Sequence, residues 1–138
     1  PSKNELESFC KTNALDRVKI FGYQNPAKYY QQAKILAFTS ANEGFGNVLI
    51  EAQQYGVVPI MFNSYSAPPD LVIDGFTGEL IEPFDIEEFT SRILAIVKEK
   101  SMLTNYSEAA IIHAENFEFD AVSNQWETIL SSLTESND

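Results

Sequence analysis

The fold is decided by residues 34–52, which read Lys34-Ile35-Leu36-Ala37-Phe38-Thr39-Ser40-Ala41-Asn42-Glu43-Gly44-Phe45-Gly46-Asn47-Val48-Leu49-Ile50-Glu51-Ala52. The first six residues form a nearly continuous apolar run, which is typical of a strand buried on both faces of a parallel sheet. A polar loop with two glycines follows. A helix is then expected from about Gly46 to Tyr55, with Gly56 at its end. A strand that leads through a short loop into a helix is the repeating unit of a parallel α/β sheet.

The flanking sequence continues this alternation of strands and helices. Further strands are expected at 18–22, 57–62 and 79–81, and helical segments at 26–32, 70–73, 86–96 and 104–114. The Asp85 and Glu88 pair has the spacing of a capping box. A last helix carries Val122, Trp126, Ile129 and Leu133 on one face. We therefore predict one Rossmann-like, three-layer α/β domain over residues 1–138, whose ligands bind beyond the carboxyl ends of the strands, where the loop 40–46 lies.

Composition and charge exclude several classes of partner. The chain has 138 residues and a net charge of −11, which opposes binding to nucleic acid and docking on anionic lipid. Residues 35–91 hold nine acidic side chains and neither Lys nor Arg, so an anion bound there depends on backbone N–H groups or on cations from elsewhere. No apolar run approaches the roughly 20 residues of a membrane span, and no signal peptide is evident. The single Cys10 forms no internal disulfide, which indicates a cytoplasmic location.

The segment 40–52 combines features that suit a phosphorylated sugar ligand. Gly44 and Gly46 flank Phe45 at the point where strand gives way to helix, and glycine permits close backbone approach. The start of the helix presents unpaired N–H groups and a partial positive charge to an anion such as a diphosphate. Glu43 lies just before the helix and Glu51 about one turn inside it. Both carboxylates therefore face one crevice, where they accept hydrogen bonds from sugar hydroxyls.

On spacing alone, an ordinary tight connection with an exposed helical Glu51 remains the alternative. The sequence contains no Asp-x-Asp metal motif, P-loop, G-x-G-x-x-G or Cys/His ligand spacing, so we expect neither a metal site nor a cofactor. His113 is the only histidine. It is expected in mid-helix, far from the glycine loop, in a surface or packing role.

The residues Glu43-Gly44-Phe45-Gly46, with Glu51 eight positions after Glu43, resemble the signature of the retaining GT-B glycosyltransferases of family 4. The segments 17–23, 52–60 and 69–81 are similar to the strands and loops that flank that signature. The resemblance covers about residues 15–130. It implies the C-terminal, donor-binding domain of a GT-B enzyme that transfers a hexosyl group from a UDP or GDP sugar to an acceptor with retention.

The resemblance also implies a role for each matching residue. Glu43 is expected to be the catalytic carboxylate beside the transferred sugar. The backbone of Gly44, Phe45, Gly46 and Asn47 is expected to hold the sugar or diphosphate. Glu51 is expected to bind the ribose hydroxyls. Gly22 and Tyr23 match the loop that borders the base, and Leu49 either lines the nucleoside pocket or packs in the core.

Two departures from the family pattern matter. The Arg and Lys that usually bind the diphosphate have no counterpart, because their strand–helix unit is expected to be missing ahead of residue 18. The segment Ser64-Tyr65-Ser66-Ala67-Pro68-Pro69 replaces a Gly-rich turn, which is expected to alter donor fit.

The N-terminal acceptor domain is also expected to be absent, so we expect the chain alone to be inactive. The whole enzyme is expected to act in polysaccharide assembly, in the cytoplasm or at the inner face of the membrane. The alternatives are a nucleotide-sugar-binding module without chemistry and an enzyme of the nucleotide-sugar epimerase kind.

Overall fold

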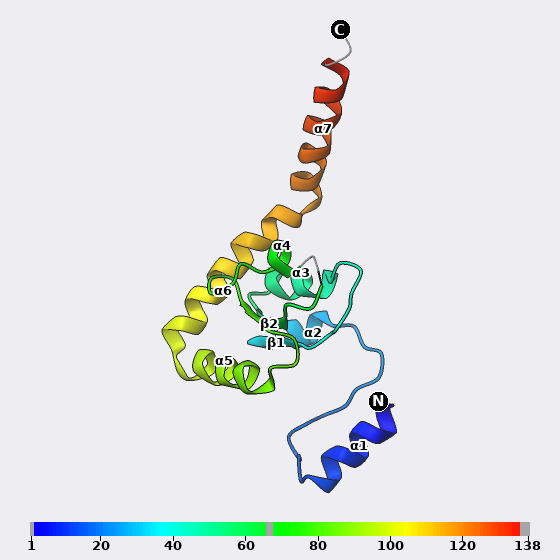
Figure 1. The fold of residues 1–138 in the computed structure, drawn as a ribbon, viewed down its shortest axis with the longest axis vertical. Coiled ribbons are helices and arrows are strands. Elements are labelled where there is room, and N and C mark those ends of the chain that lie inside the picture. The colour runs from blue at the N-terminus through cyan, green and yellow to red at the C-terminus, as the bar shows by residue number, and fades with distance from the viewer. Residues whose placement is uncertain (1, 66–67, 136–138) are drawn as a thin grey trace.

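A parallel sheet of three strands lies at the centre of the fold (Figure 1). Its strands are β1 (Ile35–Phe38), β2 (Val58–Phe62) and β3 (Glu79–Ile81), in that order, with Ile35 opposite Val58 and Ile60 opposite Glu79. This computed structural model describes residues 2–65 and 68–135, so Ser66 and Ala67 of the segment that replaces the Gly-rich turn lie outside the described residues. The parallel α/β fold class predicted from the sequence is confirmed.

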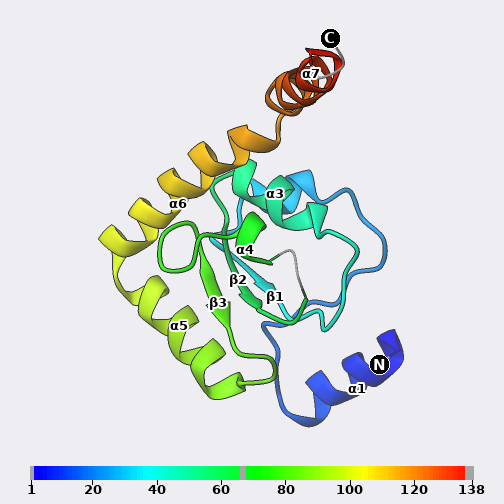
Figure 2. The ribbon, with the colours of Figure 1, turned by 45° about the horizontal axis from the view of Figure 1, so that its top comes forward.

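Strand β2 is buried along its whole length because helices cover both faces of the sheet. Successive side chains of a strand point to opposite faces. Val58, Ile60 and Phe62 pack with residues of helices α5 (Ile86–Lys98) and α6 (Lys100–Ala114). Met61 faces the other way, toward α3 (Asn47–Gln54), α4 (Pro68–Leu71) and the end of α6. Figure 2 shows the sheet between these two groups of helices.

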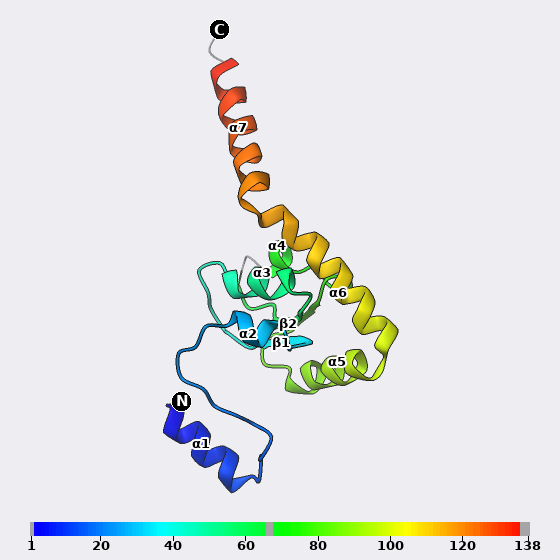
Figure 3. The ribbon, with the colours of Figure 1, turned by 180° about the vertical axis from the view of Figure 1, so that it is seen from behind.

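The remaining helices flank this body. Helix α1 (Lys3–Thr12) comes first, and α2 (Ala27–Tyr30) directly precedes β1. A 3₁₀ turn, η1 (Glu115–Phe117), joins α6 to the last helix, α7 (Phe119–Glu135). Helix α7 extends away from the sheet in the views of Figures 1 and 3. Its predicted apolar face is largely exposed, with Trp126 at 58 % exposure.

The strand predicted at 18–22 is wrong: these residues form an extended segment outside the sheet. Val18 and Phe21 are more than half exposed. A strand needs a neighbouring backbone to bond with, and no strand of the described residues lies beside this segment. Strand β1, expected to be buried on both faces, is only partly buried because it lies at the edge of the three-stranded sheet, with β2 as its neighbour.

Two helices differ from expectation in detail. Helix α1 was not predicted, although Ser2 and Glu5 form a complete capping box at its start. On α3 the buried face is Leu49, Ile50, Ala52 and Gln53, whereas Tyr55, at the end of the expected helix, is 45 % exposed. Tyr55 lies beyond the last helical turn, where its ring packs against Tyr30.

One buried polar cluster links β3 to the helices on its face. The Glu79 side chain, only 4 % exposed, accepts a hydrogen bond from the Tyr106 hydroxyl and lies 3.6 Å from Nη1 of Arg92. Burial and the neighbouring Glu79 carboxylate raise the pKa of Tyr106 above its ordinary value. A buried carboxylate that loses a donor retains its desolvation cost, so the cluster stabilises the fold as a unit.

We predict that Tyr106→Phe lowers the free energy of unfolding by about 1–2 kcal/mol at neutral pH, because Glu79 loses its neutral donor. The raised pKa of Tyr106 contributes stability that is fully present below about pH 10 and is lost as pH rises, because the unfolded chain ionises first. The difference in free energy of unfolding between wild type and variant should therefore become smaller above about pH 10. Urea unfolding of both proteins at a series of pH values measures this difference, and a difference that does not change with pH would contradict the prediction.

Candidate functional site

The loop that follows β1 is fastened to the loop that follows β2. Both loops leave the carboxyl edge of the sheet because the two strands are parallel. The Ser64 hydroxyl donates a hydrogen bond of 2.8 Å to the backbone oxygen of Ser40. The Ser40 hydroxyl in turn lies 2.8 Å from Oε1 of Glu43. A chain of two serines therefore orients the exposed Glu43 carboxylate from within the fold.

Helix α3 begins with a backbone that favours an anion. Gly46 occupies its N-cap position in the left-handed conformation, with φ of 97° and no side-chain capping bond. In the part of the chain that the structure describes, the N–H groups of Asn47 and Val48 have no hydrogen-bond acceptor. Unpaired N–H groups at a helix start carry the positive end of the helix dipole. This end of α3 can therefore bind a phosphate or a carboxylate.

Glu51 lies on the exposed side of α3, one turn from its start. Its Oε2 accepts a hydrogen bond of 3.4 Å from the hydroxyl of Tyr30, a buried residue of α2. Burial, and then the charge of Glu51, raise the pKa of Tyr30, so this hydroxyl stays protonated and remains a donor at neutral pH. The contact orients Glu51 while leaving its other carboxylate oxygen free to accept from a ligand.

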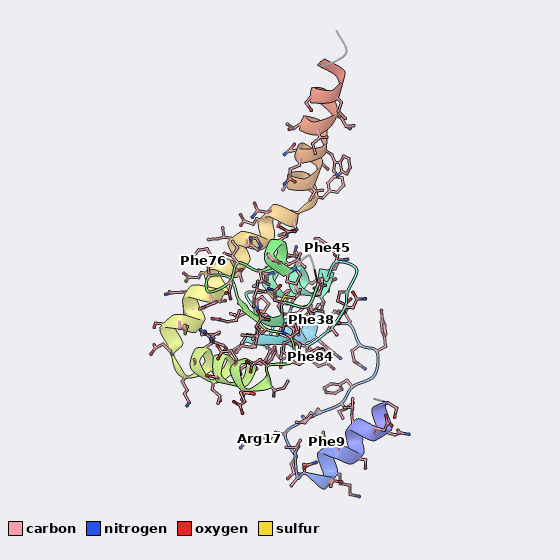
Figure 4. The ribbon with its side chains drawn as sticks, in the orientation of Figure 1. Phe9, Arg17, Phe38, Phe45, Phe76 and Phe84 are labelled. Atoms are coloured by element: carbon pink, nitrogen blue, oxygen red, sulfur yellow. The ribbon has the colours of Figure 1, made fainter. Side chains whose placement is uncertain are left out.

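A pocket of about 360 Å³ opens beside the first two turns of α3. It is lined by Phe45, Asn47, Ile50, Glu51, Gln54, Phe117 and Val122. Figure 4 labels Phe45, on the loop that leads into α3. Its ring lies 6.3 Å from the ring of Phe117. The pocket thus combines aromatic walls with three side chains, Asn47, Glu51 and Gln54, that can make hydrogen bonds.

His113 lies closer to this loop than the sequence suggested. It sits in the last turn of α6, where its ring packs edge-on against Phe117, which packs in turn against Phe45. The expectation that His113 is far from the glycine loop is therefore wrong, because the 3₁₀ turn carries Phe117 back over the loop. Its expected packing role is confirmed by the ring contact.

The structure brings together most, though not all, of the residues predicted for the site. Phe45, Asn47 and Glu51 line one pocket beside α3, whereas Glu43, Gly44 and Gly46 belong to the same loop and do not line that pocket. Leu49 is completely buried in the core with Met61 and Leu71, which favours the packing alternative for this residue. Gly22 and Tyr23 belong to the extended segment outside the sheet. Among the described residues, no hydrogen bond or ring contact joins them to the glycine loop.

Several residues of the site escaped the sequence analysis. Ser40 and Ser64 orient the loop, Tyr30 binds Glu51, and Phe117 packs on Phe45. Tyr65 lies over the start of α3, with its hydroxyl 3.5 Å from the backbone oxygen of Phe45. The position of Ser40 and Ser64, each just after a buried strand, was a usable signal, because such residues share one edge of the sheet. Nothing in the sequence indicated Tyr30 or Phe117, whose contacts arise from the tertiary fold.

In residues 2–65 and 68–135, no group of three or more His, Cys, Asp or Glu side chains is arranged to hold a metal ion. Within the same ranges, none of the helices has the length and apolar character needed to cross a membrane.

The fold and the sequence place the protein among known enzymes. The parallel sheet with helices on both faces matches the C-terminal, Rossmann-like domain of GT-B glycosyltransferases. Residues 1–113 match the family described as Glycosyl transferases group 1. Since the match covers most of the chain, the protein belongs to this glycosyltransferase family.

Three similar proteins illustrate the match. The chain is 30 % identical over 134 residues to a poly(glycerol-phosphate) alpha-glucosyltransferase of Bacillus subtilis, covering 96 % of this chain and 20 % of that protein. TarM of S. aureus superposes with a TM-score of 0.83 at 24 % identity, covering 93 % of this chain and 26 % of TarM. HepE of Anabaena, in complex with UDP and glucose, superposes with a TM-score of 0.79 at 25 % identity. The superposition covers 94 % of this chain and 36 % of HepE. The chain thus spans a fifth of the curated relative and about a third or less of the two solved proteins.

Two glycines of the same loop provide a matched pair for testing the site geometry. A Cβ on Gly46 would lie 2.8 Å from the Tyr65 hydroxyl and would adopt a left-handed φ, whereas a Cβ on Gly44 meets nothing within 4 Å. We predict that Gly46→Ala lowers the free energy of unfolding by about 1–2 kcal/mol. Gly44→Ala should change it by less than about 0.5 kcal/mol. Chemical denaturation of the two variants measures both values, and equal losses would contradict this account of the loop.

Proposed function

We propose that the chain is the donor-binding part of a retaining glycosyltransferase that uses a nucleotide diphosphate sugar. The observation that carries this proposal is the position of Glu43 and Glu51 on either side of the uncapped start of α3. Family membership supplies the reaction class, sugar transfer. The local chemistry supports the donor, because the site combines an anion-binding helix start with two carboxylates that accept hydrogen bonds from hydroxyls.

In this proposal the diphosphate lies at the start of α3. The N–H groups of Asn47 and Val48 bind its oxygens, and the helix dipole stabilises the charge that develops as the diphosphate leaves. Gly44 and Gly46 let the ligand approach the backbone closely because neither carries a side chain. The mechanism needs no metal ion, because these donors take up the charge.

Glu43 is the residue we assign to the transferred sugar. Its carboxylate accepts hydrogen bonds from the sugar hydroxyls and stabilises positive charge at the anomeric carbon as the bond to the diphosphate breaks. The acceptor then attacks the face from which the diphosphate departs, so the configuration is retained. The Ser40 hydroxyl holds Glu43 in place and lowers the cost of ordering it on binding.

Glu51 is assigned to the ribose of the nucleotide. The Tyr30 hydroxyl makes a long contact of 3.4 Å with one of its oxygens, and the other remains available to a ribose hydroxyl. HepE, a similar protein, is described in complex with UDP and glucose, which favours a UDP sugar as the donor. The relative from Bacillus subtilis is an alpha-glucosyltransferase, which favours a hexose and the assembly of a polymer.

The acceptor is assigned to a separate domain of the whole protein. The chain spans only 20–36 % of the similar proteins above, and the catalytic centre of a GT-B enzyme lies between two domains. A binding module without chemistry shares the donor site and differs only in lacking the acceptor domain. An epimerase-like enzyme of the same architecture would also bind a nucleotide sugar, but would convert it into another nucleotide sugar without an acceptor.

Binding of a nucleoside diphosphate by the chain tests the donor site directly. We predict that UDP shifts the amide resonances of Phe45, Gly46 and Asn47 in a nitrogen-15 NMR titration, with a Kd of about 1 mM, or about −4 kcal/mol. GDP, ADP and CMP in parallel titrations identify the preferred base. Glu51→Gln should weaken binding of the preferred nucleotide, because the ribose loses a charged acceptor.

The matched control is Glu108→Gln, which removes the same charge from an exposed residue of α6 beside Lys34, at the amino end of β1. This variant should bind as the wild type does. If no nucleotide shifts the loop resonances, or if both Glu variants bind equally, the assignment of the donor site is wrong.

A second test concerns the need for another domain. We predict that the chain alone releases no labelled glucose from UDP-glucose, either to water or to an added glycerol-phosphate acceptor. The reason is that hydrogen bonds to the acceptor and exclusion of water both depend on closure against a second domain. Turnover by the purified chain, abolished in Glu43→Gln, would show that this domain is sufficient for catalysis.

A further inference from the structure

Tyr65 projects over the start of α3 from the loop that follows β2. Its hydroxyl oxygen would lie 2.8 Å from a Cβ placed on Gly46 and lies 3.5 Å from the backbone oxygen of Phe45. The ring packs against the core cluster that contains Leu49 and Leu71, so the hydroxyl is held in place by a partly buried side chain. Both anchors place a phenolic hydroxyl directly beside the glycine loop.

This hydroxyl is available to a stronger acceptor than the one it has. A distance of 3.5 Å to Phe45 O is at the outer limit for an O–H···O hydrogen bond, which is strongest near 2.7–2.8 Å. Burial, and then the charge of Glu43, raise the pKa of Tyr65, so the phenol keeps its proton at neutral pH. Tyr65 therefore offers a proton donor beside an anionic side chain.

The site needs such a donor. Residues 35–91 contain neither Lys nor Arg, so within this segment only neutral donors are available to the charge of a bound diphosphate. The N–H groups at the start of α3 supply some of them, and a phenol adds a donor that reaches further than the backbone does. Tyr65 also stands in the segment where the family resemblance departs from a Gly-rich turn, which has no side-chain donor of this kind.

We infer that the Tyr65 hydroxyl binds the diphosphate of the donor, donating a hydrogen bond to an oxygen of its second phosphate at the start of α3. The inference rests on the proposed function and adds to it a binding residue particular to this chain. On binding, the hydroxyl exchanges its long contact with Phe45 O for a charge-assisted bond to phosphate, which is the stronger of the two. Tyr65 thereby supplies at the second phosphate a part of what a cationic side chain would supply.

The test compares Tyr65→Phe with the wild-type chain in NMR titrations against UMP, UDP and UDP-glucose, with GMP and GDP in parallel. Phenylalanine keeps the ring and its packing, so only the hydroxyl is removed. We expect Tyr65→Phe to weaken UDP and UDP-glucose about tenfold, the value of one hydrogen bond to a charged group, and to leave UMP unchanged. The matched control is Tyr55→Phe, which removes an exposed hydroxyl at the far end of α3 and should alter none of the affinities.

The other outcomes each overturn the inference. Equal affinity of wild type and Tyr65→Phe for UDP would leave the hydroxyl without a role in binding. A loss that extends equally to UMP would show that the hydroxyl only fastens the loop, and a loss confined to UDP-glucose would move the contact to the sugar. The failure of the proposed function is distinct, since the wild-type chain would then bind none of the nucleotides.

Discussion

The left-handed turn at Gly46 is the constraint on which the rest of the site depends. With φ of 97°, this residue ends the loop from β1 and begins α3 without a capping side chain. A Ser or Asp at this position would bond to the N–H groups of the first turn itself. Glycine leaves those groups unpaired and leaves room above them. The empty cap therefore costs some helix stability and keeps the N–H groups open to an external acceptor.

The surroundings of Gly46 offset that cost by packing. Leu49, three residues into α3, is completely buried, and Gln53 donates from the buried face to the backbone oxygen of Leu71. Helix α3 is therefore held by its contacts with the core rather than by its first turn, in keeping with the modest intrinsic stability of short helices. The loop before it is held in the same manner from outside, by Ser64 bonding to Ser40 and by Tyr65 above Gly46. A rigid frame around an uncapped helix start is a favourable arrangement for binding, because little of the protein must be ordered when the ligand arrives.

The elements that the sequence predicted well are those whose pattern reflects burial within the chain. β2 and α3 are examples, because the apolar run 57–62 indicates a buried strand and the glycines at 46 and 56 mark the two ends of a helix. The prediction of a strand at 18–22 is wrong because alternating apolar and polar residues indicate the two faces of a strand. They do not indicate whether a neighbouring strand is present to form hydrogen bonds with it. Within the site, Glu43 and Glu51 were predicted by family resemblance, whereas Ser40 and Tyr65 were not. Their roles come from contacts between two loops about twenty residues apart, and spacing along the chain does not encode such contacts.

The aromatic contacts at the 3₁₀ turn join the glycine loop to the end of the domain. Phe117 packs on Phe45 from one side and on His113 from the other, and it stands two residues before α7 begins. Helix α7 leaves the body of the domain at this turn (Figure 1), so any change in its direction pivots close to Phe117. The Phe117 ring therefore connects the glycine loop, through Phe45, to the point where α7 leaves the body of the domain. The unpaired N–H groups of α3 follow that loop directly, so the same aromatic contacts support the start of α3 from the C-terminal side of the chain.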